Sequence, residues 1–83
     1  MSHLTLDARR LLCPLPVIRL QKKIQGLQAG DILTITCTDP GAEQDIPAWC
    51  RLHGHTILKT KTNRNETSIT LQISQGLSNA SPG

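Results

Sequence analysis

Cys13 is the residue of this 83-residue chain whose neighbours in the sequence are most typical of chemistry. It precedes Pro14-Leu15-Pro16, and proline is well tolerated in the first turn of a helix, where its missing N–H costs nothing. We therefore expect a helix that begins at Pro14, with Cys13 as its N-cap and Pro16 stiffening the first turn. The positive end of the helix dipole lowers the pKa of a thiol there, so Cys13 is predicted to be partly ionised at neutral pH.

Basic residues lie on both sides of this cysteine. They are Arg9, Arg10, Arg19, Lys22 and Lys23. Their charge would stabilise a thiolate or attract an acidic partner. Since no His, Asp or Glu adjoins Cys13, nothing local indicates a cysteine-protease arrangement. The alternative interpretation is that Cys13 is a small buried residue at a proline-rich helix start, because cysteines are often buried.

The other two cysteines are better explained as core residues. Cys37 lies on the apolar side of a predicted strand, and Cys50 shares an apolar helical stripe with Trp49. Cys50, His53 and His55 would supply three metal ligands, but a fourth is missing, so structural histidines are the better interpretation. Three cysteines without a C-x-x-C pair also make no disulfide framework. We expect neither a metal nor a cofactor.

The length of the chain allows one domain with a marginal core. Its apolar residues include 12 Leu and 8 Ile but one Trp and no Phe or Tyr, which argues against modules that stack bases on aromatic side chains. A net charge of +3 favours an acidic partner only weakly. No signal peptide or membrane span is recognisable, so a cytoplasmic location is expected.

Apolar periodicity predicts the elements that must position Cys13. Alternation predicts strands over residues 4–6, 31–38, 56–62 and 67–73, whereas the helical period predicts helices from residue 14 to about 25 and from 45 to 53. A four-residue hairpin loop, 63–66, would join the last two strands. The order βαβαββ indicates a two-layer α/β sandwich, in which two helices cover one face of a four-stranded sheet. Residues 1–74 would form this single domain, and residues 75–83 a disordered tail.

Several short motifs, in this order and spacing, resemble the TusA family, also called SirA-like. They are Leu6-Asp7-Ala8, Cys13-Pro14-Leu15-Pro16, Gly30-Asp31, Asp39-Pro40, Asp45-Ile46-Pro47-Ala48-Trp49-Cys50 and Gly54-His55. The match runs from about residue 4 to residue 73. The resemblance implies a mixed sheet with strand order 1-2-4-3.

The family resemblance also implies a function, which is to carry sulfur. Cys13 would accept sulfane sulfur as a persulfide from a cysteine desulfurase or a rhodanese, and pass it to a TusD- or DsrE-like protein. The sulfur would then enter 2-thiouridine of tRNA, molybdenum-cofactor synthesis or sulfur oxidation. Such a protein is a sulfurtransferase component without independent turnover, and we expect it to be a monomer, since it must dock two partners in turn.

The chain departs from the family pattern in two places. Leu12 and Leu15 replace the Arg and Glu that tRNA-thiolating members often carry, and the last strand, 70–73, lacks their basic residues. These positions flank the sulfur or the docking face, so donor and acceptor stay open. The sequence is also compatible with two other classes of protein: a small basic nucleic-acid-binding module, and a thiol redox regulator that would need a second cysteine close to Cys13.

Overall fold

The computed structural model describes residues 3–12 and 14–74, which form a four-stranded sheet and two helices. The elements are β1 (His3–Ala8), α1 (Leu15–Ile24), β2 (Ile32–Cys37), α2 (Ala42–His53), β3 (Thr56–Asn63) and β4 (Glu66–Gln72). This order confirms the predicted βαβαββ sandwich. The predicted tail, residues 75–83, lies outside the described residues. Neither of the two described helices is long and apolar enough to cross a membrane.

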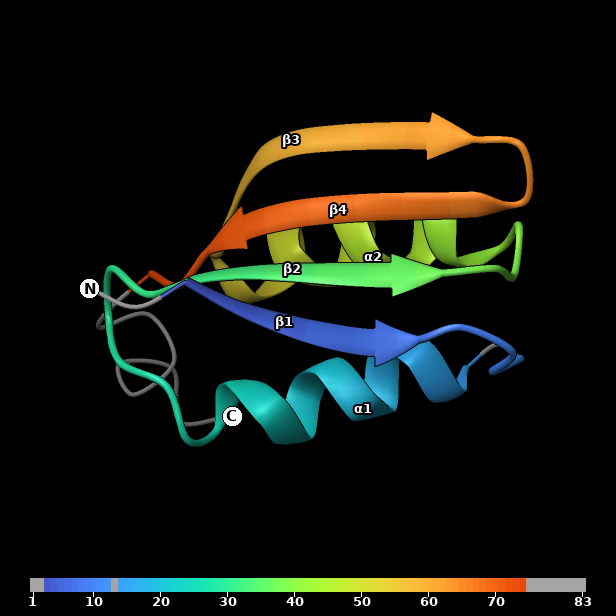
Figure 1. Cartoon of the computed structure of the whole chain (residues 1–83). Coiled ribbons are helices and arrows are strands. Elements are labelled where there is room, and N and C mark those ends of the chain that lie inside the picture. The colour runs from blue at the N-terminus through green and yellow to red at the C-terminus, as the bar shows by residue number, and fades with distance from the viewer. Residues whose placement is uncertain (1–2, 13, 75–83) are drawn as a thin grey trace.

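The sheet has the strand order β1-β2-β4-β3, as the family resemblance implied (Figure 1). β1 and β2 are parallel, and β4 runs antiparallel to both β2 and β3. Because β1 and β2 are parallel, both strands end at the same edge of the sheet, and a helix follows each of them. The segment from β1 to α1, which contains Cys13, therefore lies at this carboxyl edge.

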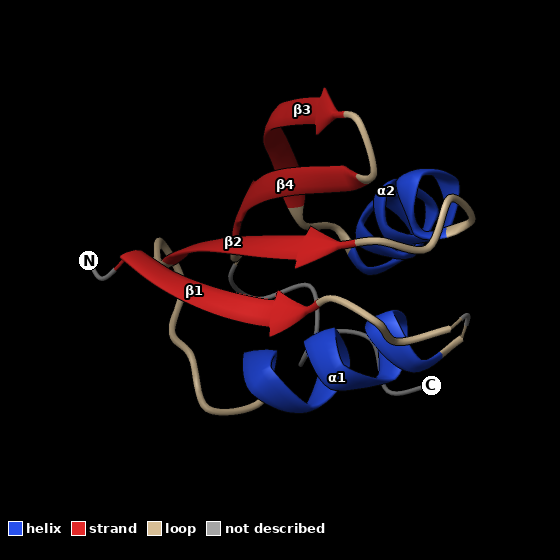
Figure 2. Cartoon of the chain, turned by 45° about the vertical axis from the view of Figure 1, so that its right-hand side comes forward, coloured by secondary structure: helices blue, strands red, loops and turns tan. Residues whose placement is uncertain are grey.

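Both helices pack on one face of the sheet (Figure 2). The buried positions alternate along the two central strands, as the period of a strand requires. The fully buried core side chains on these strands are Leu33, Ile35, Cys37, Ile69 and Leu71. From the helices, Leu20 of α1 and Ile46 and Cys50 of α2 complete this core. The helices bury their apolar stripes here and leave their polar sides to solvent.

The opposite face of the sheet is uncovered by helices and carries hydroxyl groups. The Thr34 and Thr70 hydroxyls, on paired positions of β2 and β4, lie 3.0 Å apart, and those of Thr36 and Ser68 lie 3.4 Å apart. Paired hydroxyls across a sheet satisfy each other and interact with water. β2 therefore has one apolar face that packs in the core and one polar face that carries hydroxyl groups.

α2 begins earlier than predicted, at Ala42 rather than just after Asp45. Its first turn is formed by the Asp39-Pro40-Gly41 segment, since the N–H groups of Ala42 and Asp45 donate to the carbonyls of Asp39 and Gly41 at 3.0 and 2.9 Å. Pro47 consequently lies inside the helix instead of in its first turn. The predicted start at residue 45 was wrong because the turn at Asp39-Pro40-Gly41 leads directly into the helix.

The β3–β4 hairpin is tighter than predicted. Asn63 pairs with Glu66, so the loop contains two residues, Arg64 and Asn65, in place of four. Arg64 has a φ of 54°, the left-handed conformation that such short loops require. A register shift between Ile57 and Lys59 adds a bulge to β3, and this interrupts the regular edge of the sheet.

Candidate functional site

The predicted sulfur-bearing residue, Cys13, lies outside the described residues, so the site is defined by the residues on either side of it. The β1–α1 segment runs from Arg9 to Pro14, at the carboxyl edge of the sheet. Leu12 and Pro14, the two neighbours of Cys13 in the chain, are both exposed.

α1 starts one residue later than predicted. Pro14 is the N-cap, with φ −98° and ψ 18°, so Cys13 stands one position before the cap in the sequence. The Leu15 N–H donates to the Leu12 carbonyl at 2.7 Å, and the Ile18 N–H donates to the Pro14 carbonyl at 3.2 Å. Pro16 occupies the first turn and is fully buried, and its missing N–H would have no partner inside the helix. The two prolines thus anchor the start of the helix, one exposed and one in the core.

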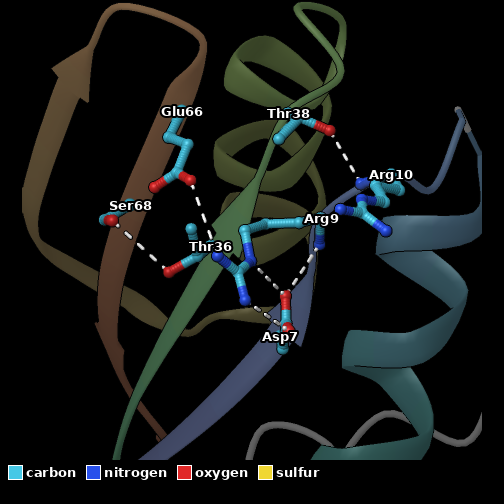
Figure 3. A network of polar contacts seen from close by, with 7 residues as sticks. All are labelled: Asp7, Arg9, Arg10, Thr36, Thr38, Glu66 and Ser68. Carbon is cyan, nitrogen blue, oxygen red and sulfur yellow. Dashed lines mark hydrogen bonds and ion pairs between the residues drawn. The ribbon is translucent and has the colours of Figure 1, made fainter.

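Arg9 fastens the beginning of this segment to the sheet (Figure 3). Its Nε and Nη2 donate to the two carboxylate oxygens of Asp7 at 2.9 and 3.0 Å, and its backbone N–H donates to Asp7 Oδ1 at 3.0 Å. Its Nη1 also lies 3.7 Å from Oε2 of Glu66, at the start of β4. The hydrogen bonds from Arg9 lower the pKa of Asp7 to about 2. Arg9 was predicted to dock partners, but its guanidinium already has two carboxylate partners within the chain.

Arg10 fastens the same segment to the end of β2. Its backbone N–H donates to the hydroxyl of Thr38 at 2.7 Å, and the next N–H, of Leu11, lies 3.4 Å from the Ala8 carbonyl. Arg10 has a φ of 69°, which places its backbone in the left-handed region. This turn carries the chain away from β1 toward the start of α1, and its hydrogen bond to Thr38 holds it there.

A hollow of about 330 Å³ adjoins these contacts. It is lined by Asp7, Arg9, Arg10, Thr38 and Glu66. Its two carboxylates and two guanidinium groups balance in charge, so the hollow favours neither anions nor cations. Its observed role is structural, because the residues lining it hold the β1–α1 segment against β2 and β4.

The remaining predicted docking residues lie on α1. Arg19, Lys22 and Lys23 are exposed there, with Lys22 and Lys23 in the last turn, where positive charge complements the helix dipole. Three exposed apolar side chains, Leu12, Leu15 and Ile18, accompany them. The structure therefore separates two basic groups: Arg9 and Arg10 beside the hollow, and three cations along α1.

Cys37 and Cys50 are free thiols in the core, as predicted. Burial raises the pKa of Cys37 to about 11 and that of Cys50 to about 12. Asp39 also contributes to the shift at Cys37. Both thiols are therefore protonated at neutral pH and shielded from solvent, which makes them poor nucleophiles.

The histidines near Cys50 form an aromatic cluster with Trp49. The Trp49 ring centroid lies 4.5 Å from that of His53 and 5.6 Å from that of His55. His55 is buried, and its Nδ1 accepts a hydrogen bond from the Ser74 N–H at 3.2 Å. Within residues 3–12 and 14–74, no group of three His, Cys, Asp or Glu is arranged to hold a metal ion. The structural interpretation of these histidines is supported by their packing.

Two residues of this site were not singled out from the sequence, Thr38 and Glu66. Thr38 was read only as the end of a strand and Glu66 only as part of a loop. Both act on residues far away in the chain, at Arg10 and Arg9. No local pattern signals such contacts, although Asp7, which holds Arg9, belongs to a motif quoted above.

The fold and the cysteine-bearing segment at the start of α1 define a two-layer α/β domain of the SirA-like type. A solved SirA-like protein from Desulfitobacterium hafniense superposes with a TM-score of 0.74 and 23% identity, covering 87% of this chain and 99% of its own. This similarity establishes the fold.

Family membership follows from the sequence comparisons. The family model described as Sulfurtransferase TusA matches residues 4–73. A protein of Neisseria meningitidis serogroup A, provisionally named a sulfur carrier, is 39% identical over 72 residues, or 87% of this chain and 97% of its own. The sulfur carrier protein TusA of Pseudomonas entomophila is 46% identical over 54 residues, covering 65% of this chain and 68% of its own. The chain belongs to the TusA family.

Proposed function

We propose that this protein is a sulfur carrier that holds sulfane sulfur on Cys13 as a persulfide. The observation that carries the proposal is the contrast between the three cysteines. Cys37 and Cys50 are fully buried, whereas Cys13 is joined on both sides to exposed residues at the start of α1. The family match, together with relatives named as sulfur carriers, supports the same role.

Sulfur transfer to Cys13 requires a thiolate. The Cys13 thiolate attacks the outer sulfur of a donor persulfide, so a sulfur–sulfur bond forms at Cys13 while the donor's sulfur–sulfur bond breaks. The donor cysteine leaves as a thiolate, and the persulfide proton stays with the transferred sulfur. A thiolate of the acceptor then attacks the outer sulfur on Cys13 in the same way. Neither step needs an external oxidant or reductant, because one sulfur–sulfur bond replaces another.

The segment that carries Cys13 suits this exchange between proteins. Its backbone is tied to β2 through Thr38, and its start is tied to Asp7 and Glu66 through Arg9. Because Arg9 and Arg10 are held in this way, they present the same backbone to each partner, which lowers the entropy lost on docking. Such a carrier needs an accessible sulfur rather than a deep pocket, because the exchange takes place between two protein surfaces.

The donor in this proposal is a cysteine desulfurase or a rhodanese, and the acceptor is a TusD- or DsrE-like protein. The carrier works in the cytoplasm as a monomer and has no turnover of its own. The delivered sulfur would serve tRNA thiolation, molybdenum-cofactor synthesis or sulfur oxidation. The departures at Leu12 and Leu15 favour no single one of these.

Loading with labelled sulfur tests the proposal. After incubation with a cysteine desulfurase and [35S]cysteine, intact mass should show one added sulfur atom, and peptide mapping should place it on Cys13. Cys13→Ser should take up no label and should keep the unfolding transition of the wild type. Label on Cys50, or a Cys13 disulfide to Cys37 or Cys50 in place of a persulfide, would contradict the carrier role.

A further inference from the structure

Three large apolar side chains are exposed just before α1 and in its first half, outside the core. Leu12 is 70% exposed, Leu15 47% and Ile18 42%. Leu15 and Ile18 are three residues apart on α1, so they lie on one side of the helix, and Leu12 precedes them in the adjoining segment. We call these three residues the leucine patch. Apolar side chains gathered on the surface of a small domain are typical of an interface.

Cations border the leucine patch on α1. Arg19 follows Leu15 by four residues and Lys22 follows Ile18 by four, so each cation lies next to an apolar side chain on the helix surface. α1 contains no acidic residue. The outer side of this helix is therefore apolar near Cys13 and positive further along, with no carboxylate of its own to neutralise it.

From this arrangement we infer that the leucine patch is the docking surface for a sulfur-relay partner whose reactive cysteine lies in an apolar depression bordered by carboxylates. The inference rests on the proposed function. Leu12 precedes Cys13 directly in the chain, so a protein whose sulfur reaches Cys13 comes close to the backbone of Leu12. An apolar, water-free contact at the centre with charge pairs at the rim is the arrangement that protein interfaces use.

A second copy of this chain is a poor occupant of the patch. A symmetric dimer places the same surface on both sides, so each α1 would meet another helix that carries cations and no carboxylate. A partner with acidic residues at the rim instead gains both attraction and a faster encounter. The charge pattern thus selects a different protein over self-association.

The test separates docking from sulfur chemistry by using two donors. Glutathione persulfide is small enough to load Cys13 without a docking surface, whereas a cysteine desulfurase supplied with L-cysteine must dock. For Leu12→Gln/Leu15→Gln, the desulfurase concentration that gives half-maximal loading should rise about 10- to 100-fold, as expected for loss of two central interface residues. Loading from glutathione persulfide should change less than about twofold, since an exposed surface substitution leaves the thiol's surroundings intact.

Leu52→Gln is the matched control. Leu52 is 81% exposed in the last turn of α2, away from the β1–α1 segment, and its replacement should leave both loading reactions unchanged (Figure 1). Raising the salt concentration should slow loading by the desulfurase in the wild type and spare loading by glutathione persulfide, because only the first uses charge pairs. Equal unfolding midpoints would show that the double variant folds normally.

Each other outcome counts against the inference in a recognisable way. If neither donor loads the wild type, the proposed carrier function itself fails. If both donors load the double variant as well as the wild type, the patch does not dock the desulfurase. If both reactions slow equally, the leucines act on the thiol. Concentration-dependent dimers of the wild type that Leu12→Gln/Leu15→Gln abolishes would identify a second copy as the occupant. Faster loading after truncation at Ser74 would identify residues 75–83.

Discussion

Arg10 has a backbone conformation that its side chain opposes. Its φ of 69° brings Cβ close to the following carbonyl, which costs an ordinary residue about 1–2 kcal/mol. The hydrogen bond to Thr38 keeps the residue in this conformation. The strain lies three residues before Cys13, so the turn that directs the chain toward the site is held at some cost in stability.

Replacing Arg10 by glycine should therefore stabilise the protein. Glycine adopts a φ of 69° without a Cβ clash, so Arg10→Gly is expected to raise the free energy of unfolding by about 0.5–1 kcal/mol. Urea unfolding followed by circular dichroism measures this change. Arg10→Ala is the control, because it removes the guanidinium but retains Cβ. An equal gain in both variants would show that the side chain's charge, rather than its conformation, was responsible.

His55 should make stability depend on pH. Desolvation, followed by the charge of His53, lowers the pKa of buried His55, so the unfolded chain binds a proton more readily than the folded one. The contribution of neutral His55 to the free energy of unfolding is fully present above the ordinary histidine pKa of about 6.5. It is lost as the pH falls through the pKa of His55 in the folded protein. Urea midpoints measured at pH 7, 6 and 5 should decline.

A variant isolates this effect. His55→Asn retains an acceptor for the Ser74 N–H but cannot take up a proton, so its midpoints should vary less over the same range, even if all of them are lower. A slope that survives in His55→Asn would assign the pH dependence to other groups.

The β1–α1 segment depends on hydrogen bonds from residues outside it. Thr38 is the acceptor for the Arg10 N–H at 2.7 Å, and Thr38→Val removes that hydroxyl while keeping a branched side chain of similar size. We expect a loss of about 0.5–1.5 kcal/mol in the free energy of unfolding. Amide exchange at Arg10 should accelerate at the same time.

Thr38→Ser provides the comparison for this element, because it keeps the hydroxyl and loses only a methyl group. Its Arg10 amide should stay protected. Fast exchange in both variants would mean that Thr38 holds the segment through packing rather than through its oxygen. Alkylation of Cys13 by iodoacetamide can be followed in parallel, and under the proposed function its rate should change only in Thr38→Val.

The individual elements were predictable to different degrees. The alternation of Leu33, Ile35 and Cys37 predicted β2 within one residue at each end, because every second position faces the same core. The predicted start of α2 was wrong because the turn at Asp39-Pro40-Gly41 leads directly into the helix. The predicted hairpin loop was two residues longer than the observed one. The length of the loop depends on the pairing of Asn63 with Glu66 and not on loop composition.

The described part of the chain has one small hydrophobic core, so a single cavity in it should lower the free energy of unfolding strongly. A domain of this length has about 4–12 kcal/mol of stability, and Leu71 is fully buried between the sheet and the helices. Leu71→Ala should cost about 2–5 kcal/mol, measured by urea unfolding. Leu58→Ala, at the half-exposed bulge of β3, should cost less than about 1 kcal/mol. Similar losses in both would contradict the single core described above.

Local pattern was sufficient for the element types, the two-layer fold class and the assignment of Cys37 and Cys50 to the core. These features follow from hydrophobic periodicity and from turn residues, and both are patterns of residues that are close together in the sequence. Only the tertiary structure shows that Thr38 and Glu66 hold the β1–α1 segment through Arg10 and Arg9. The same is true of the balance of charges in the hollow and of the exposure of Leu12, Leu15 and Ile18. The reason is that each depends on which residues distant in the chain become neighbours, and pairwise contacts across 28 residues or more leave no periodic trace in the sequence.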